Sequence, residues 1–116
     1  MKPIDLRSDT MTKPVAAMKQ EMFAAQLDDD VYGENPTVNM LEKKAAALLG
    51  KEDAIFCPSG TQSSLIALMA HCDRGDEYIV GQDAHTYKYE AGGAAVLGSI
   101  QPQPIFLAKG QLSFLL

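Results

Sequence analysis

Apolar residues recur every three or four positions in three parts of the chain, the spacing of one face of a helix. The first part begins near Thr12–Pro14, the second at Thr37, whose hydroxyl can cap it, and the third at Ser59–Thr61. Gly50 is placed to end the second predicted helix. The apolar positions are Val15, Met18 and Met22; Val38, Leu41, Ala45 and Leu48; and Leu65, Leu68, Met69 and Cys72.

Short apolar runs between these helices predict strands. Ala54–Cys57 and Tyr78–Val80 are each typical of a buried strand, and Gln101–Ile105 indicates an edge strand because its prolines cannot donate to a ladder. A further helix is predicted over His85–Leu97, weakened at Gly92–Gly93, where something is expected to pack closely. Helices alternating with short strands indicate an α/β fold.

The junction after Cys57 carries the clearest chemistry. A predicted strand runs through Pro58 into Ser59-Gly60-Thr61 and then into a helix. The first N–H groups of a helix have no intrahelical acceptor, and the helix dipole favours an anion there, so Gly60 and Thr61 could cradle a phosphate. Ordinary helix capping by Ser and Thr explains the same residues and remains open at this point.

Composition and charge exclude several classes of protein. With 116 residues, 47% hydrophobic and 22% charged, the chain fits one folded domain that can bury a core, and it shows no internal boundary. The net charge of −5 gives no footprint for nucleic acid or an anionic membrane surface. No apolar run approaches the roughly 18 residues of a spanning helix, and charges stand where a signal peptide is apolar.

The two cysteines and two histidines, the residues that could bind a zinc ion, do not cluster in the sequence. Cys57 and Cys72 fall on a predicted strand and a predicted helix, where buried free thiols are expected and a reducing cytoplasm is the default location. His71 and His85 add no zinc-ligand spacing, so no metal site is predicted.

Five segments, in order, resemble the low-specificity L-threonine aldolases, pyridoxal-phosphate enzymes of the aspartate-aminotransferase fold type. The resemblance weakens after Ile105. The segments are Ile4-Asp-Leu-Arg-Ser-Asp-Thr10; Asp29-Asp-Val-Tyr-Gly33 with Asn35-Pro-Thr37; Phe56-Cys-Pro-Ser-Gly-Thr-Gln62; His85-Thr-Tyr87 with Glu90-Ala-Gly-Gly93; and Gly98-Ser-Ile-Gln-Pro-Gln-Pro104.

This resemblance implies a fold, an activity and partners. Residues 1–116 would be an N-terminal segment plus the first part of the large, pyridoxal-phosphate-binding domain, an incomplete fold type I sheet flanked by helices. The implied reaction cleaves L-threonine or L-allo-threonine to glycine and acetaldehyde, with the cofactor as electron sink. An amino acid substrate and a homodimer or homotetramer are implied, with no nucleic-acid or membrane partner.

The resemblance also implies roles for individual residues. Gly60 and Thr61 would hold the cofactor phosphate, and the His85 imidazole would lie over the cofactor ring. Ser8 would contact the substrate carboxylate, and Tyr32 would line the active site at a subunit boundary.

Glu90, five residues after His85, is predicted to take part in proton transfer through water. Each of these residues also has an ordinary explanation: a surface histidine, a turn serine, a packed loop tyrosine and a solvated helix glutamate.

Family members are about three times this length. The Schiff-base lysine, the aspartate facing the pyridine nitrogen and the carboxylate-binding arginines would lie in the remainder. Lys51 follows a helix end and Lys88 lies inside a predicted helix, so neither stands in the Schiff-base context. In this fold type the sheet neighbours of Ala54–Cys57 come later in the chain, so this strand is expected to be unpaired here. The chain alone is therefore expected to be marginally folded, prone to association and inactive.

Three other functions remain open from the sequence. A β-eliminating lyase would share the fold but release pyruvate and ammonia. A non-catalytic remnant would explain the absent lysine motif. A Rossmann-type phosphate-binding module would use the same cradle, but the Gly-x-Gly-x-x-Gly turn is absent.

Overall fold

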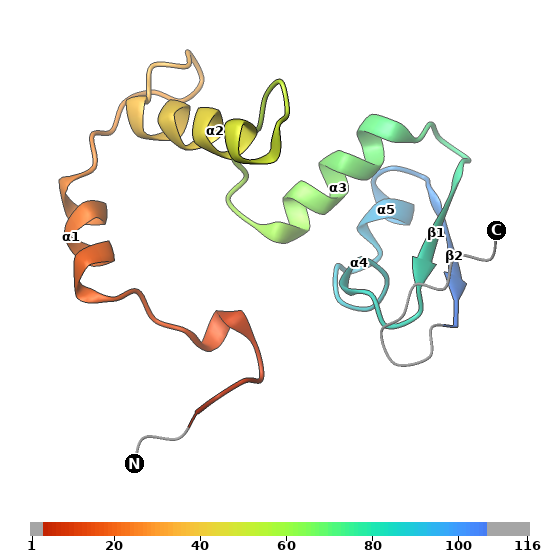
Figure 1. The fold of residues 1–116 in the computed structure, drawn as a ribbon. Coiled ribbons are helices and arrows are strands. Elements are labelled where there is room, and N and C mark those ends of the chain that lie inside the picture. The colour runs from red at the N-terminus through yellow and green to blue at the C-terminus, as the bar shows by residue number, and fades with distance from the viewer. Residues whose placement is uncertain (1–3, 107–116) are drawn as a thin grey trace. The chain divides into compact units, whose positions relative to one another are not determined.

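The chain divides into two compact units, with the division between Phe56 and Cys57. A computed structural model describes residues 4–106 (Figure 1). The sequence analysis predicted no internal boundary, because no linker-like composition marks this division. The elements are the 3₁₀ helix η1 (Asp9–Met11), α1 (Ala16–Ala24), α2 (Pro36–Leu49), α3 (Gly60–His71), β1 (Glu77–Gly81), α4 (His85–Lys88), α5 (Gly93–Val96) and β2 (Gln101–Ile105).

The first unit contains η1, α1 and α2. The first predicted helix forms as α1. Its N-cap is Val15, whose side chain makes no capping bond. Its apolar side chains remain open, with Val15, Met18 and Met22 exposed by 61%, 55% and 69%. The 3.6-residue pattern therefore predicted the helix correctly, although the described residues provide no partner for its apolar face.

Helix α2 is capped at both ends by its sequence. Asn35 is the N-cap, and its side-chain oxygen accepts from the N–H groups of Thr37 and Val38. The prediction that Thr37 is the cap was wrong: its hydroxyl donates instead to the Gln26 carbonyl, at 2.6 Å. At the other end Gly50 adopts a left-handed conformation (φ 61°), as predicted for a helix-ending glycine.

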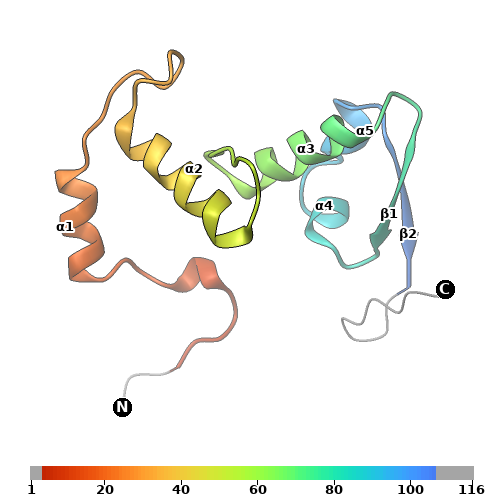
Figure 2. The ribbon, with the colours of Figure 1, turned by 45° about the horizontal axis from the view of Figure 1, so that its top comes forward.

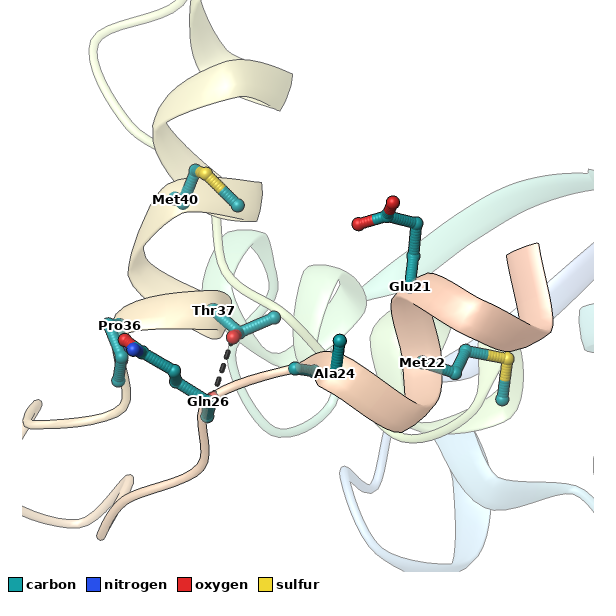
Figure 3. Close-up of a pocket in the computed structure, with 8 residues that line it drawn as sticks. Glu21, Met22, Ala24, Gln26, Pro36, Thr37 and Met40 are labelled. Carbon is teal, nitrogen blue, oxygen red and sulfur yellow. Dashed lines mark hydrogen bonds between the residues drawn. The ribbon is translucent and has the colours of Figure 1, made fainter. Parts of the chain in front are cut away.

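The Thr37 hydrogen bond crosses one side of an open apolar hollow in the first unit (Figure 3). The hollow measures about 540 Å³ and includes none of the residues that the sequence predicted for a site. Its lining residues are Glu21, Met22, Ala24, Ala25, Gln26, Pro36, Thr37 and Met40.

The predicted strand Ala54–Cys57 is wrong. These residues are irregular, and Ile55 and Phe56 are 72% and 50% exposed. The Phe56 N–H donates to Glu42 Oε1 at 2.7 Å rather than to a strand neighbour. An apolar run becomes a strand only where another strand accepts its backbone bonds, and within residues 4–106 none lies alongside it.

The second unit is built on a parallel pair of strands. β1 and β2 pair from Glu77 with Gln101 to Gly81 with Ile105, and α3 and α5 lie to one side of them (Figure 2). The α/β prediction is confirmed as a mixture of helices and parallel strands. Of the predicted buried strand Tyr78–Val80, only Val80 is buried, whereas Ile79 is 76% exposed.

The prolines of β2 fit an edge position. The Gln101 N–H donates to the Asp76 carbonyl at 2.8 Å, so the N–H groups at alternate positions point toward β1. Pro102 and Pro104 occupy the other positions, where the backbone nitrogen points away from β1. The missing donors therefore do not interrupt the pairing.

The predicted helix His85–Leu97 forms as two short helices instead of one. Helix α4 ends at its C-cap Tyr89, and Ala91 (φ 53°) and Gly92 (φ 66°) then adopt left-handed conformations that turn the chain into α5. A Cβ on Gly93 would lie 3.9 Å from Leu65 of α3, an ordinary contact distance, so the prediction that something packs closely at the glycine pair was wrong.

Few apolar residues are buried within residues 4–106, contrary to the expected sizeable core. They are Ala46, Val80, Ala94 and Ile100, the last only 1% exposed. Both cysteines are free thiols and half-buried, so the expectation of fully buried thiols was too strong. In the described part of the chain no helix has the length and apolar character to cross a membrane.

Gly98 is required by packing around Ile100. A Cβ at this position would lie 2.9 Å from the Ala94 carbonyl oxygen and 2.8 Å from Ile100 Cδ1. We expect Gly98→Ala to lower the free energy of unfolding by about 1–3 kcal/mol, because backbone must move. Urea unfolding measures this. The matched control is Gly93→Ala, whose Cβ has room, and an equal loss in both variants would contradict the prediction.

Candidate functional site

The start of α3 presents free backbone donors. Ser59 is the N-cap: its hydroxyl accepts from Gln62 N–H at 3.1 Å, and its carbonyl accepts from Ser63 N–H at 3.1 Å. Gly60 and Thr61 are the first two helical residues, and no acceptor among residues 4–106 bonds their N–H groups. Capping and anion binding are therefore compatible here, since the cap uses other donors.

Gly60 has open space where a side chain would be. No heavy atom lies within 4 Å of a Cβ built there, so internal packing does not require the glycine. Gly60 and Thr61 are both exposed. A phosphate approaching the helix end would fill the space that a Cβ would take, so these residues fit an anionic group.

His85 and Glu90 form a direct hydrogen bond in the same unit. His85 Nδ1 lies 2.9 Å from Glu90 Oε1. The histidine side chain is 67% exposed, whereas the glutamate side chain is only 7% exposed. His85 is the first residue of α4, and the Tyr89 ring lies 5.5 Å from its ring, tilted by 43°.

The turn after α4 places Glu90, which is not the helical residue that the sequence predicted. Glu90 lies between α4 and α5, and its carbonyl accepts from Gly93 N–H at 3.0 Å. The left-handed Ala91 and Gly92 follow it directly. The ordinary explanation as a solvated helix glutamate is also wrong, because the carboxylate is nearly buried.

Lys88, the last residue of α4, pairs with Asp83. The Asp83 carboxylate raises the pKa of Lys88 by hydrogen bonding and charge attraction, and Lys88 lowers the pKa of Asp83 in the same way. The pair therefore favours the protonated form of the Lys88 amine, which is not nucleophilic. The pair lines an open hollow with Gln82, Tyr87 and Pro104.

Ser8 and Tyr32 lie in the first unit. Ser8 is the N-cap of η1, and its hydroxyl lies within hydrogen-bond distance of Asp9 and Thr10 side chains. Arg7 pairs with Asp5 and lowers the pKa of that carboxyl. Tyr32 is 78% exposed in the turn before α2, so it is not a packed loop tyrosine.

Of the predicted site residues, the structure joins His85 to Glu90 and puts Gly60 and Thr61 in the same unit, where α3 contacts α4 and α5. Sequence reasoning missed Tyr89 and the Asp83–Lys88 pair. The spacing of five between Asp83 and Lys88 is also that between His85 and Glu90, and neither spacing matches one helix face. Among residues 4–106, no three potential ligand side chains group closely enough to hold a metal ion.

The sequence pattern of the β-eliminating lyases matches residues 5–114. The chain belongs to the β-eliminating lyase family. The match continues beyond Ile105, where the motifs weakened, into residues 107–114, which lie outside the described part of the chain.

Several curated members of the family are similar to this chain. It is 68% identical over 102 residues to the low specificity L-threonine aldolase of Escherichia coli K12, covering 88% of this chain and 31% of the relative. It is 47% identical over 106 residues to low-specificity L-threonine aldolase 1 of Arabidopsis thaliana, covering 90% and 30%. The Saccharomyces cerevisiae enzyme is 39% identical over 107 residues, covering 91% and 28%. The chain thus spans about a third of their length.

The Asp83–Lys88 pair gives a pH prediction. Because the pKa of Asp83 is lowered and that of Lys88 raised, the attraction acts across neutral pH. It is lost as pH falls through the lowered Asp83 pKa or rises through the raised Lys88 pKa. We expect Asp83→Asn to return the pKa of Lys88 toward its ordinary value, measured by side-chain NMR titration. In the control Glu77→Gln the Lys88 pKa should not move, and an unmoved pKa in Asp83→Asn would contradict the pairing.

Proposed function

We propose that this chain forms the first part of a pyridoxal-phosphate-dependent aldolase that cleaves L-threonine or L-allo-threonine to glycine and acetaldehyde. The names of its relatives support the reaction, and family membership supports the cofactor. The observation that carries the proposal is the open, donor-rich start of α3 at Gly60 and Thr61. Residues 1–116 would then belong to the N-terminal segment and large domain of a fold type I enzyme.

Gly60 and Thr61 would hold the phosphate of the cofactor through backbone N–H groups, with the α3 dipole adding attraction. When bound, pyridoxal phosphate supplies the electron sink for cleavage of the bond between Cα and Cβ. Gly60 has the space for this close approach, which a larger residue would occupy.

His85 would restrain the cofactor ring from one face. Its imidazole is planar and largely exposed, and its partners Glu90 and Tyr89 contact it from within the same turn. Because Glu90 and Tyr89 hold the imidazole from two sides, the plane of the imidazole is restrained. A restrained plane favours stacking of the imidazole on the cofactor ring. Glu90 would contribute to proton movement through the imidazole it bonds, rather than through water as the sequence suggested.

Ser8 and Tyr32 would meet the substrate, Ser8 at its carboxylate and Tyr32 beside the active site. Both are exposed and offer a hydroxyl, so each is available to a ligand. A homodimer or homotetramer would bring Tyr32 to a subunit boundary. A cytoplasmic location is part of the proposal because both cysteines are free thiols.

A chimera tests the reaction. Residues 1–106 replace the matching segment of the Escherichia coli relative, and purified chimera is given L-threonine with pyridoxal phosphate. We expect glycine and acetaldehyde in equal amounts. A β-eliminating lyase, which the family description favours as the second candidate, would instead release pyruvate and ammonia from a suitable amino acid. A chimera that folds, binds cofactor and produces no glycine would contradict the proposal.

Variants of the chimera test the cofactor residues. Gly60→Val should weaken pyridoxal phosphate binding by about tenfold or more, because the side chain fills the space of the phosphate. His85→Ala should lower both cofactor retention and cleavage rate. Cofactor absorbance during dialysis and glycine release measure these effects. The matched control is Ala47→Val, which adds a side chain of similar size at an exposed position of α2, and equal cofactor loss there would contradict the assignment.

A further inference from the structure

Glu90 is a nearly buried carboxylate bonded to an exposed ring. Its side chain is 7% exposed, and His85 Nδ1 at 2.9 Å is the side-chain partner that the structure gives it. Burying a carboxylate is costly unless a donor satisfies it. The bond to His85 is therefore more than a surface ion pair, because the carboxylate depends on this donor and water reaches it little.

The bond also decides which ring nitrogen carries the proton. A carboxylate only accepts, so Nδ1 must donate, and in the neutral imidazole Nε2 is then the acceptor. We propose that Glu90 is a positioning residue that holds His85 in the Nδ1-protonated tautomer and fixes its ring plane, leaving Nε2 to face the reaction. Only the statement that Nε2 faces the reacting groups rests on the proposed function.

The backbone of the turn supports this role. Glu90 is followed by Ala91 at φ 53° and Gly92 at φ 66°. A non-glycine residue in the left-handed region costs about 1–2 kcal/mol, so the fold stabilises a conformation that the local sequence disfavours. That conformation turns the chain immediately after Glu90, and its carboxylate reaches back to the first residue of α4.

Backbone hydrogen bonds hold both residues of the pair in place, one at the His85 carbonyl and one at the Glu90 carbonyl. The His85 carbonyl accepts from Tyr89 N–H at 2.9 Å, and the Glu90 carbonyl accepts from Gly93 N–H at 3.0 Å. The Tyr89 ring contacts the imidazole. Lys88 is occupied by Asp83 and does not compete for the Glu90 carboxylate.

Nitrogen NMR of the histidine-labelled chimera, recorded without cofactor and with His85 assigned from the His85→Ala variant, tests the tautomer directly. Above pH 8, where an ordinary imidazole is neutral, we expect His85 to give the Nδ1–H pattern. Glu90→Gln replaces the carboxylate by an amide that can also donate, so the Nδ1–H population of His85 should fall. His71, at the end of α3, is the internal reference and should not change. The exposed Glu52→Gln is the matched control.

Two results would overturn the inference: an Nε2–H pattern for His85 in the unaltered chimera, or the same Nδ1–H population in Glu90→Gln. Because the spectrum is recorded without cofactor, its outcome is separate from the aldolase proposal. In the chimera, Glu90→Gln should slow glycine release by about tenfold or more, the usual effect of removing a partner that orients a working imidazole. Full activity with a changed tautomer would limit Glu90 to structure and would also overturn the inference.

Discussion

The parallel pairing of β1 with β2 is the constraint on which the second unit depends. A chain that leaves Gly81 must return to Gln101 in the same direction, so residues 82–100 have to cross over. The crossover contains α4, the turn at Glu90 and α5, and it ends at Ile100, the most buried residue among those described. His85 and Glu90 therefore lie on a crossover whose two ends are held by the pairing of β1 with β2. A change in the register of that pairing would move the turn and its hydrogen bond together.

Local signals in the sequence predicted the elements whose causes are local. Gly50 ends α2 because only its own conformation is needed, and Ser59 caps α3 through a bond three residues away. The prolines of β2 indicated an edge strand because each acts through its own missing N–H. In contrast, Ala54–Cys57 required a neighbouring strand that the described residues do not provide. The apolar composition of this segment indicated that burial would favour it, but it did not show whether a neighbouring strand is present.

The candidate site also contains features with local causes and a feature without one. Gly60 and Thr61 were predictable because a helix start exposes donors whatever surrounds it. The direct bond between His85 and Glu90 was not, because a spacing of five places two residues on different faces of a helix. They come together because the chain leaves the helix at Tyr89 (φ −123°, ψ −2°), before it reaches Glu90. The sequence therefore nominated the residues of the candidate site but did not predict the contact between His85 and Glu90.

Two glycines show how the structure separates packing from function. At Gly98 an added Cβ would meet the Ala94 carbonyl and the Ile100 side chain, so the fold itself excludes any larger residue. At Gly60 an added Cβ would meet nothing, and the conformation there is open to any residue. Packing among the described residues therefore does not require glycine at position 60. The proposed anion at the two unused N–H groups would give the missing side chain a purpose.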